Sequence, residues 1–185
     1  MKKRQVIVIG AGASGLIAAG QAASMGAETL LLEKMHRPGR KLRITGNGRC
    51  NLTNSAPVSE FTARFGPNGR FLRSAFSHFF ADDLVDFLEE IGIHTVVERG
   101  GRIFPVSNQA QDVVDALVYW INKQGVTLRT GLTADQLLIE SEKIVGVQVC
   151  HSFSDNKEKS LPKHDDKRIY RASAVIIATG GASYP

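Results

Sequence analysis

The sequence contains no long hydrophobic run and very little cysteine. No apolar stretch in its 185 residues reaches the ~20 residues that a membrane-spanning helix needs, which excludes the integral membrane class. The two cysteines, Cys50 and Cys150, lie far apart and form no CxxC or histidine-rich pattern, which argues against a disulfide scaffold or a structural zinc site. We therefore expect a cytoplasmic protein with reduced thiols.

Aromatic residues are also scarce, at 7% of the chain, whereas there are 18 glycines. Hydrophobic residues make up 43% and charged residues 22%, which is the profile of one globular domain with a real core. The charge is unevenly placed, because residues 36–73 hold eight bases and a single acid, Glu60, in a chain of formal net charge +5. This basic segment indicates an anionic ligand, either cofactor phosphates or a nucleic acid backbone, with a solvated surface as the alternative.

The N-terminal residues predict a βαβ unit. Residues 6–9 are a β-branched run that indicates a strand buried on both faces. Residues 14–25 are rich in alanine and leucine and indicate a helix that ends at Gly26. Residues 29–32 predict a second buried strand, which ends at Glu33.

The turn between the first strand and the helix has the pattern GxGxxG, at residues 10–15. Gly10 allows the tight turn, Gly12 lets the backbone approach a pyrophosphate, and Gly15 lets helix and strand pack closely. The phosphates would meet free N–H groups and the positive end of the helix dipole. Glu33 would accept hydrogen bonds from ribose hydroxyls and repel a 2′-phosphate, so FAD or NAD fits this site better than NADP.

The remaining pattern predicts the rest of the fold. Helices are expected over residues 69–80, 82–91 and 109–123, and strands over residues 94–98, 102–104, 126–129, 134–140, 144–151, 169–172 and 174–178, with irregular structure over 37–69 and a polar stretch over 152–168. The fold class is therefore α/β, a Rossmann-like FAD-binding domain of the glutathione reductase type. It has a parallel sheet, a three-stranded antiparallel meander at about residues 133–172 and a helical insertion at about residues 56–124. This plan favours FAD over NAD as the cofactor.

Three further motifs make a family resemblance specific. They are GRKL at residues 39–42 followed by TGNGRCNLTN at residues 45–54, GRIFP at residues 101–105, and ATGGASYP at residues 178–185. With these motifs the whole chain resembles the BaiN/RdsA (YhiN-like) family of NAD(P)/FAD-dependent oxidoreductases. The resemblance implies FAD as cofactor, NAD(P)H as electron donor and a small organic substrate, which in one family branch is an unsaturated bile acid intermediate. Family members are about twice as long, so we expect an N-terminal fragment without the C-terminal substrate domain.

The candidate site residues follow from the pattern and the resemblance together. Basic side chains shortly after Glu33 can neutralise phosphate, the glycine-rich loop at residues 46–48 can run against a flat ring, and the strand end near Thr179 can pass close to the cofactor. We interpret Cys50 as a packed, inert thiol. No metal site and no catalytic residue is identified. The candidate cofactor-binding residues are Gly10, Gly12, Ala13, Ser14, Gly15, Glu33, Lys34, Arg40, Lys41, Gly46, Asn47, Gly48, Arg49, Cys50, Asn51, Thr179, Gly180 and Gly181.

Three functional hypotheses remain at this point. The first is an FAD-dependent oxidoreductase that moves a hydride from a nicotinamide donor through flavin to an unsaturated or carbonyl substrate. The second is a non-catalytic dinucleotide-binding module, and the third is an RNA-modifying flavoprotein that uses the basic segment. We do not expect nucleic acid as the partner, because Phe61, Phe65, Phe71 and Phe76 are predicted to be core anchors and not exposed stacking groups.

Overall fold

The computed structural model describes residues 4–152 and 167–181. The chain divides into two compact units, of which unit 1 comprises Met1–Lys41 and Leu117–Pro185, and unit 2 comprises Leu42–Ala116. Apart from its ends, the polar stretch expected over residues 152–168 lies outside the described residues.

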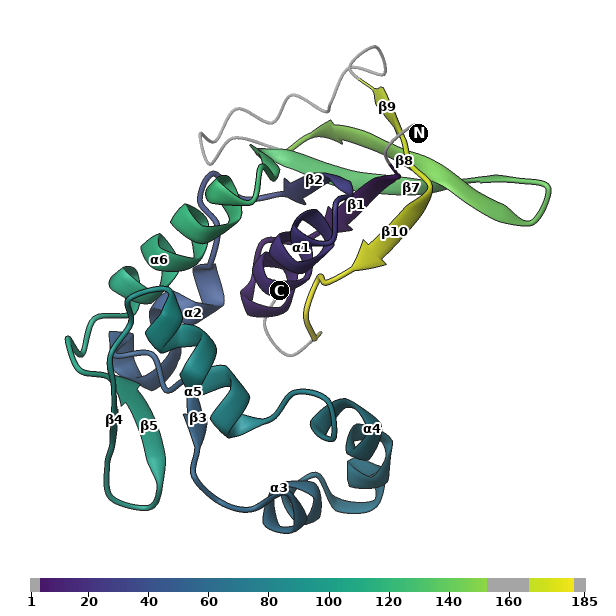
Figure 1. Ribbon diagram of the computed structural model, residues 1–185. Coiled ribbons are helices and arrows are strands. Elements are labelled where there is room, and N and C mark those ends of the chain that lie inside the picture. The colour runs from purple at the N-terminus through teal and green to yellow at the C-terminus, as the bar shows by residue number, and fades with distance from the viewer. Residues whose placement is uncertain (1–3, 153–166, 182–185) are drawn as a thin grey trace. The chain divides into compact units, whose positions relative to one another are not determined.

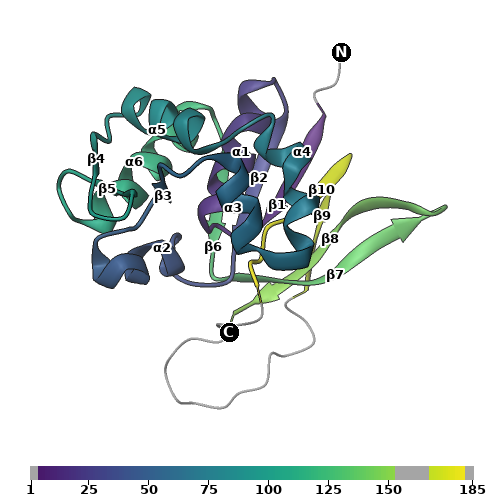
Figure 2. The same ribbon diagram turned by 90° about the horizontal axis from the view of Figure 1, so that it is seen from below.

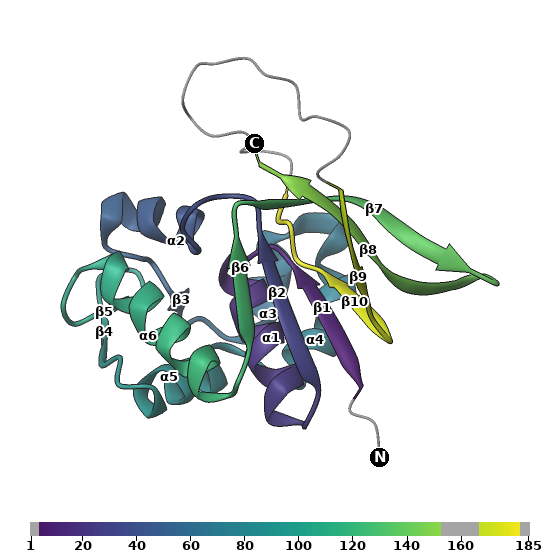
Figure 3. The ribbon, with the colours of Figure 1, turned by 90° about the horizontal axis from the view of Figure 1, so that it is seen from above.

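Unit 1 contains a four-stranded parallel sheet. Its order is β10-β1-β2-β6, formed by β1 (Gln5–Ile9), β2 (Glu28–Glu33), β6 (Thr127–Thr130) and β10 (Ala174–Ile177), and Figure 3 shows the strands from above. In the register, Ile9 stands beside both Leu32 and Ile177. The carboxyl ends of β1, β2 and β10 therefore lie at one edge, where ligands bind in open α/β sheets. The Rossmann-like fold class is confirmed.

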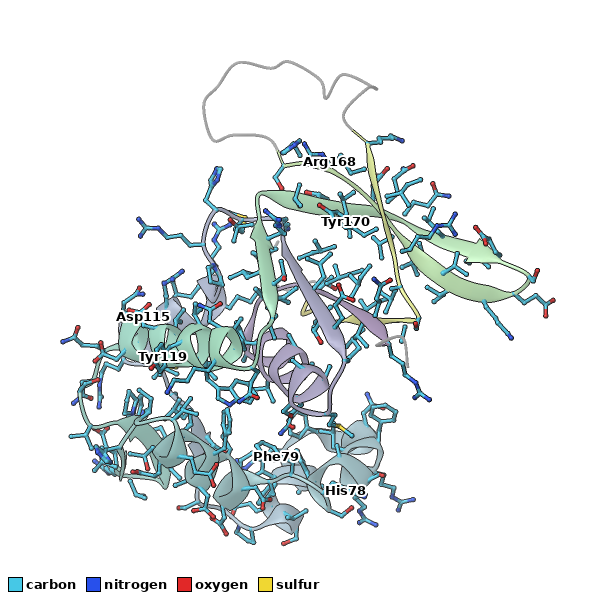
Figure 4. The ribbon with its side chains drawn as sticks, turned by 45° about the horizontal axis from the view of Figure 1, so that its top comes forward. His78, Phe79, Asp115, Tyr119, Arg168 and Tyr170 are labelled. Atoms are coloured by element: carbon cyan, nitrogen blue, oxygen red, sulfur yellow. The ribbon has the colours of Figure 1, made fainter. Side chains whose placement is uncertain are left out.

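A three-stranded antiparallel meander covers one face of this sheet. It has the order β7-β8-β9, with β7 (Leu132–Glu140), β8 (Lys143–His151) and β9 (Arg168–Arg171), as the sequence predicted. Ile7 and Leu32 of the sheet pack with Val147 and Val149 of the meander in one buried cluster, and the Tyr170 ring, labelled in Figure 4, packs against it. Burial of these apolar side chains holds the meander on the sheet.

Helix α1 (Ala13–Ser24) packs against β1 and β2, and Figure 1 shows it in front of these strands. Its buried face includes Leu16 and Ala19. A Cβ added at Gly20 would lie only 2.1 Å from the Trp120 ring of α6 (Ala110–Lys123), so glycine at this position lets the two helices approach closely. Among the described residues, no helix is both long and apolar enough to cross a membrane.

Unit 2 combines a small antiparallel sheet with short helices. The sheet order is β3-β5-β4, with β3 (Thr53–Asn54), β4 (Thr95–Val97) and β5 (Arg102–Pro105), so the predicted hairpin is confirmed. The helices include α3 (Val58–Arg64), η2 (Gly66–Leu72), α4 (Arg73–Phe76) and α5 (Ala81–Glu90), and Figure 2 shows α3 beside α4. The predicted helix over residues 82–91 matches α5 to within one residue.

Two expectations for this region are wrong. Residues 37–69 are not wholly irregular, because they contain α2 (Arg40–Ile44), η1 (Thr45–Gly48), β3 and α3, which are too short to show a clear periodicity. The single helix expected over residues 69–80 is instead the end of η2 followed by α4. A Cβ added at Gly69 would lie 1.9 Å from the Thr62 carbonyl oxygen, so the backbone of η2 packs directly on α3 and the chain must bend there.

Candidate cofactor-binding site

The three glycines of the GxGxxG loop meet three different surroundings in unit 1. Gly10 has φ +99°, and an added Cβ would lie 2.6 Å from the Ala178 carbonyl oxygen. An added Cβ at Gly15 would lie 1.7 Å from the Gly10 carbonyl oxygen. At Gly12, in contrast, an added Cβ would meet nothing within 4 Å. Gly10 and Gly15 are therefore required by the packing of the fold, whereas Gly12 leaves open space beside the backbone.

The open space lies at the N-terminus of α1, whose N-cap is Gly12. The first N–H groups of an α-helix have no partner inside the helix, and the helix dipole makes this end positive. Ala13 and Ser14 are exposed in this first turn, while Gly15 is buried. The arrangement offers unpaired donors and room for a phosphate group, which are the requirements for binding a pyrophosphate at a helix end.

Glu33 lies at the end of β2 and faces the glycine loop. Its Oε2 accepts the Ala11 N–H at 2.7 Å, and its Oε1 accepts the Met35 N–H at 2.8 Å. A further hydrogen bond holds the glycine loop, because the Gly39 N–H donates to the Ala11 carbonyl oxygen at 2.8 Å. An ionised carboxylate has about four acceptor positions, so Glu33 keeps capacity for ribose hydroxyls after these two bonds are made.

Three of the predicted basic residues, Lys34, Arg40 and Lys41, follow Glu33 along the chain in unit 1. Lys41 Nζ donates to the Gly181 carbonyl oxygen at 3.3 Å, which brings the start of α2 to the chain segment after β10. Arg40 is exposed and its Nη1 lies 3.8 Å from the Met35 sulfur. Lys34 is exposed directly after Glu33. These cations add positive charge to the part of unit 1 that holds the loop and Glu33.

The end of β10 completes the candidate site in unit 1. Thr179, Gly180 and Gly181 follow the strand as an exposed segment, and Gly180 has φ +80°. Since Ala178 lies against Gly10, this segment begins beside the glycine loop. Unit 1 therefore brings together three of the predicted groups: the loop at residues 10–15, Glu33, and residues 179–181 with Lys41.

The remaining predicted site residues form a separate loop in unit 2. Gly46 and Asn47 are consecutive left-handed residues, with φ 59° and 56°, and Gly48 and Cys50 follow with φ 85° and 62°. The added Cβ at Gly46 would lie 3.0 Å from both the Asn51 nitrogen and the Phe104 ring. Gly46, Asn47 and Asn51 are exposed, so this tightly wound backbone faces solvent on one side.

Arg49 makes an unpredicted set of contacts inside unit 2. Its guanidinium forms an ion pair with Glu98, donates from Nε to Asn108 Oδ1 at 2.7 Å, and lies 4.2 Å from the centre of the Phe104 ring. The Phe104 ring covers one face of the guanidinium, and Glu98 and Asn108 accept hydrogen bonds at its edges. Sequence reasoning missed Glu98, Phe104 and Asn108 as partners, because their spacing along the chain gives no sign that they converge on Arg49.

Cys50 is fully buried in unit 2, and burial raises the pKa of its thiol to about 11. At neutral pH the group is therefore a protonated thiol, which is a poor nucleophile. This environment supports the interpretation of Cys50 as a packed side chain. Within the described residues, no group of three His, Cys, Asp or Glu side chains is placed to hold a metal ion.

The expectation that four phenylalanines are core anchors is wrong for two of them. Phe61 and Phe76 are half-buried and their rings meet edge to face at 6.0 Å, as expected. Phe65 is 53% exposed and Phe71 is 87% exposed. The reason is local, since η2 turns against α3 at Gly69 and leaves the ring of Phe71 outside the small aromatic core.

The parallel sheet, the glycine loop at the start of α1 and the acidic end of β2 define a Rossmann-like α/β domain. The chain belongs to the family described as HI0933-like protein Rossmann domain, whose model matches residues 4–185.

Characterised relatives are similar over nearly the whole chain but are much longer than it. One is the 3-dehydro-bile acid delta(4,6)-reductase of Clostridium scindens, which is 35% identical over 94% of this chain and 38% of its own length. Another is the ribosomal RNA dihydrouridine synthase of Escherichia coli, which is 31% identical over 100% of this chain and 41% of its own length. The chain thus spans about two fifths of the length of these relatives.

A solved structure agrees on the fold. The 3-ketosteroid-delta4-(5alpha)-dehydrogenase of Rhodococcus jostii superposes with a TM-score of 0.64 at 17% identity, covering 97% of this chain and 46% of that chain. At this level of identity the likeness extends to the fold alone.

Proposed function

We propose that this chain is the FAD-binding part of a reductase that adds a hydride to a conjugated carbon–carbon double bond, with NADH or NADPH as the electron donor. One observation carries the proposal: the open space at Gly12, at the positive end of α1, lies in the same loop whose Ala11 N–H is held by Glu33. This juxtaposition suits a pyrophosphate joined to an adenosine ribose.

The chain's own residues would bind and orient the cofactor. The N–H groups of the first turn of α1 would hold the pyrophosphate, Glu33 would accept the ribose hydroxyls, and Lys41 would balance phosphate charge. When bound, FAD would supply the redox chemistry, by taking a hydride from the nicotinamide and passing it to the substrate. Within unit 2, the left-handed residues of the loop at residues 46–51 leave backbone groups exposed to solvent.

The two characterised relatives support the reaction class. Reduction of a delta(4,6) bile acid and formation of dihydrouridine both add hydrogen across a carbon–carbon double bond that is conjugated to a carbonyl group. A small steroid-like enone is the first candidate substrate, and uridine in RNA is the second. The second candidate is favoured by one observation of this structure, namely the exposure of Phe65 and Phe71 within the basic segment.

Cofactor titration tests the binding half of the proposal. Isothermal titration of the chain with FAD, ADP, NADP⁺ and FMN should give FAD as the tightest ligand and measurable binding of ADP. FMN lacks the adenylate half that Glu33 and the α1 loop would recognise, so it should bind at least 10-fold more weakly, a difference of about 1.4 kcal/mol. Equal affinity for FMN and FAD, or no binding of either, would contradict the proposal.

Reductase activity is tested by following flavin absorbance without oxygen. The FAD-loaded protein should bleach with NADH or NADPH and recover its colour when a 4,6-dien-3-one steroid or a uridine-containing RNA is added. A flavin that is reduced but reoxidised by neither compound would remove both candidate substrates while leaving cofactor binding intact.

A further inference from the structure

The helical segment of unit 2 at residues 57–80 exposes aromatic rings to solvent, and we call it the helical surface. Phe71 is 87% exposed, Phe65 53% and Phe79 41%. His78, two residues after the end of α4, is exposed as well, and Figure 4 labels His78 and Phe79. Large exposed aromatic side chains grouped on one short segment mark an interaction site more often than isolated ones do.

Among the described residues, Phe71 and Phe79 make no ring contact with the local core, whereas Phe65 lies at its margin, with its ring centre 6.5 Å from that of Phe76. Phe61, Phe76 and Phe80 form that core by edge-to-face contacts, with ring centres 5.0 Å apart for Phe61 and Phe80 and 5.1 Å apart for Phe76 and Phe80. Phe71 takes part in none of the ring contacts found among the described residues. Because its ring stays exposed, Phe71 does not gain the stabilisation that burial of an apolar side chain would give the free protein. The ring is therefore available to a partner.

The charged residues of the helical surface are almost all basic. The surface contains Arg64, Arg70 and Arg73, all of them exposed, and a single acid. That acid, Glu60, forms an ion pair with Arg64 at 3.2 Å, which leaves the charges of Arg70 and Arg73 uncompensated within the segment. Asp82 and Asp83 follow at the start of α5, where Asp83 accepts the Phe80 N–H at 2.7 Å, and α5 packs on β3 and β4.

Arg70 and Arg73 bracket Phe71 along the chain. A partner that fits must offer a flat ring to Phe71 and negative charge to the arginines within a few ångströms of it. Unpaired nucleotides offer both, because each has a base with two stacking faces and a phosphate on either side. A protein partner would need an apolar pocket with acidic residues around it, and a duplex hides its bases.

We propose that the helical surface binds single-stranded or looped RNA, with a base stacked on Phe71 and phosphates held by Arg70 and Arg73. This surface would serve the second candidate substrate, uridine in RNA. Only the reduction that follows RNA binding rests on the proposed function. The surface itself requires no cofactor.

Fluorescence anisotropy with a labelled oligouridylate of about 12 nucleotides measures this binding, since single-strand sites span about 4–16 nucleotides. The unlabelled competitors are the same strand and its duplex with oligoadenylate. We expect the single strand to compete at least 10-fold better than the duplex. Flavin absorbance, read in the same samples, shows whether FAD is bound, so a failure of RNA binding with FAD retained overturns only the present proposal.

Variants of Phe71 separate stacking from general apolar contact. Phe71→Leu should weaken binding of the single strand about 5- to 30-fold, because leucine keeps apolar area but offers no ring, whereas Phe71→Trp should bind as well as or better than the parent. Tyr119→Leu is the matched control, since Tyr119 is an exposed ring on α6, outside the helical surface. Equal weakening in the control, or no loss with Phe71→Leu, would overturn the assignment of Phe71.

Charge variants test the arginines. The double substitution of Arg70→Gln and Arg73→Gln should reduce the slope of log K against log salt by about 1.4, since each phosphate contact to a single strand contributes about 0.7. Arg129→Gln with Arg168→Gln removes the same charge from exposed positions on β6 and β9 and should leave the slope unchanged. If the two double variants give the same slope of log K against log salt, the RNA is attracted by net charge alone. That result would contradict a binding site at Arg70 and Arg73. Circular dichroism of each variant confirms that it is folded.

Discussion

The carboxylate of Glu33 accepts the backbone N–H of Ala11 at 2.7 Å, so the end of β2 holds the glycine loop that follows β1. The second oxygen accepts the Met35 N–H, which fixes the direction in which the chain leaves β2. One acidic side chain therefore shapes the loop in addition to the ribose-binding role that the sequence predicts for it.

Replacement of Glu33 by alanine should accordingly change two measurements. FAD binding should weaken by about 1–3 kcal/mol, because ribose hydroxyls and the Ala11 N–H both lose an acceptor. The melting temperature of the protein without FAD should also fall. Glu28→Ala, at the opposite end of the same strand, is the control and should leave FAD affinity unchanged. If Glu33→Ala lowers the melting temperature but not FAD affinity, the residue supports the loop without touching the cofactor.

The glycine loop offers a matched pair of substitutions. Gly12→Ala should leave the melting temperature nearly unchanged, since a Cβ there meets nothing within 4 Å, but it should weaken FAD binding because the methyl group occupies the space assigned to the pyrophosphate. Gly15→Ala should destabilise the fold by about 3 kcal/mol or more, since the Cβ would lie 1.7 Å from the Gly10 carbonyl oxygen. Thermal melts with and without FAD distinguish the two effects. Equal loss of stability in both variants would contradict the separate roles.

The sequence predicted unit 1 far better than unit 2, and the reason is physical. Buried parallel strands such as residues 6–9 must be apolar throughout, and the glycine loop must fit between strand and helix, so both leave clear patterns. In unit 2 the amphipathic α5 and the hairpin of β4 and β5 leave such patterns, but the short helices η1, α3, η2 and α4 do not. The exposure of Phe71 depends on how η2 packs at Gly69, and the contacts of Arg49 depend on residues about 50 positions further along the chain. Composition and spacing do not encode either relationship.

Cys50 provides a test based on pH. Burial raises the pKa of its thiol to about 11, so alkylation by iodoacetamide at pH 8 should be slow and should accelerate toward pH 11. A thiol whose pKa is higher in the folded than in the unfolded state adds stability below the unfolded value, and this stability is lost as the pH rises. The free energy of unfolding should therefore fall as the pH increases from 9.0 toward about 11.

The variant Cys50→Ser is the control for that measurement, because serine does not titrate in this range. Mass spectrometry separates modification of Cys50 from that of Cys150, which is only half-buried. Rapid alkylation of Cys50 at neutral pH would mean that its thiol is reactive, and the interpretation of an inert packed side chain would be wrong.

Arg49 has a structural role in the loop of unit 2 at residues 46–51 that flavin binding does not require, because it contacts Glu98, Asn108 and Phe104. Arg49→Ala should lower the free energy of unfolding by only about 1–2 kcal/mol, because both partners of the ion pair are about one third exposed and solvent screens their attraction. Arg49→Lys should lose nearly as much, since an ammonium cannot stack on Phe104 and bridge two acceptors at once.

A double-mutant cycle with Glu98→Ala should give a coupling energy of about 0.5–1 kcal/mol, and Arg99→Ala, on the same hairpin, should have little effect. Chemical denaturation measures stability and flavin absorbance measures cofactor retention in the same samples. If stability is unchanged in Arg49→Ala while FAD is lost, the guanidinium binds the cofactor and its contacts in the free protein are secondary. If stability falls and FAD affinity is kept, Arg49 acts by fixing the backbone of residues 46–51 through its contacts with Glu98 and Asn108.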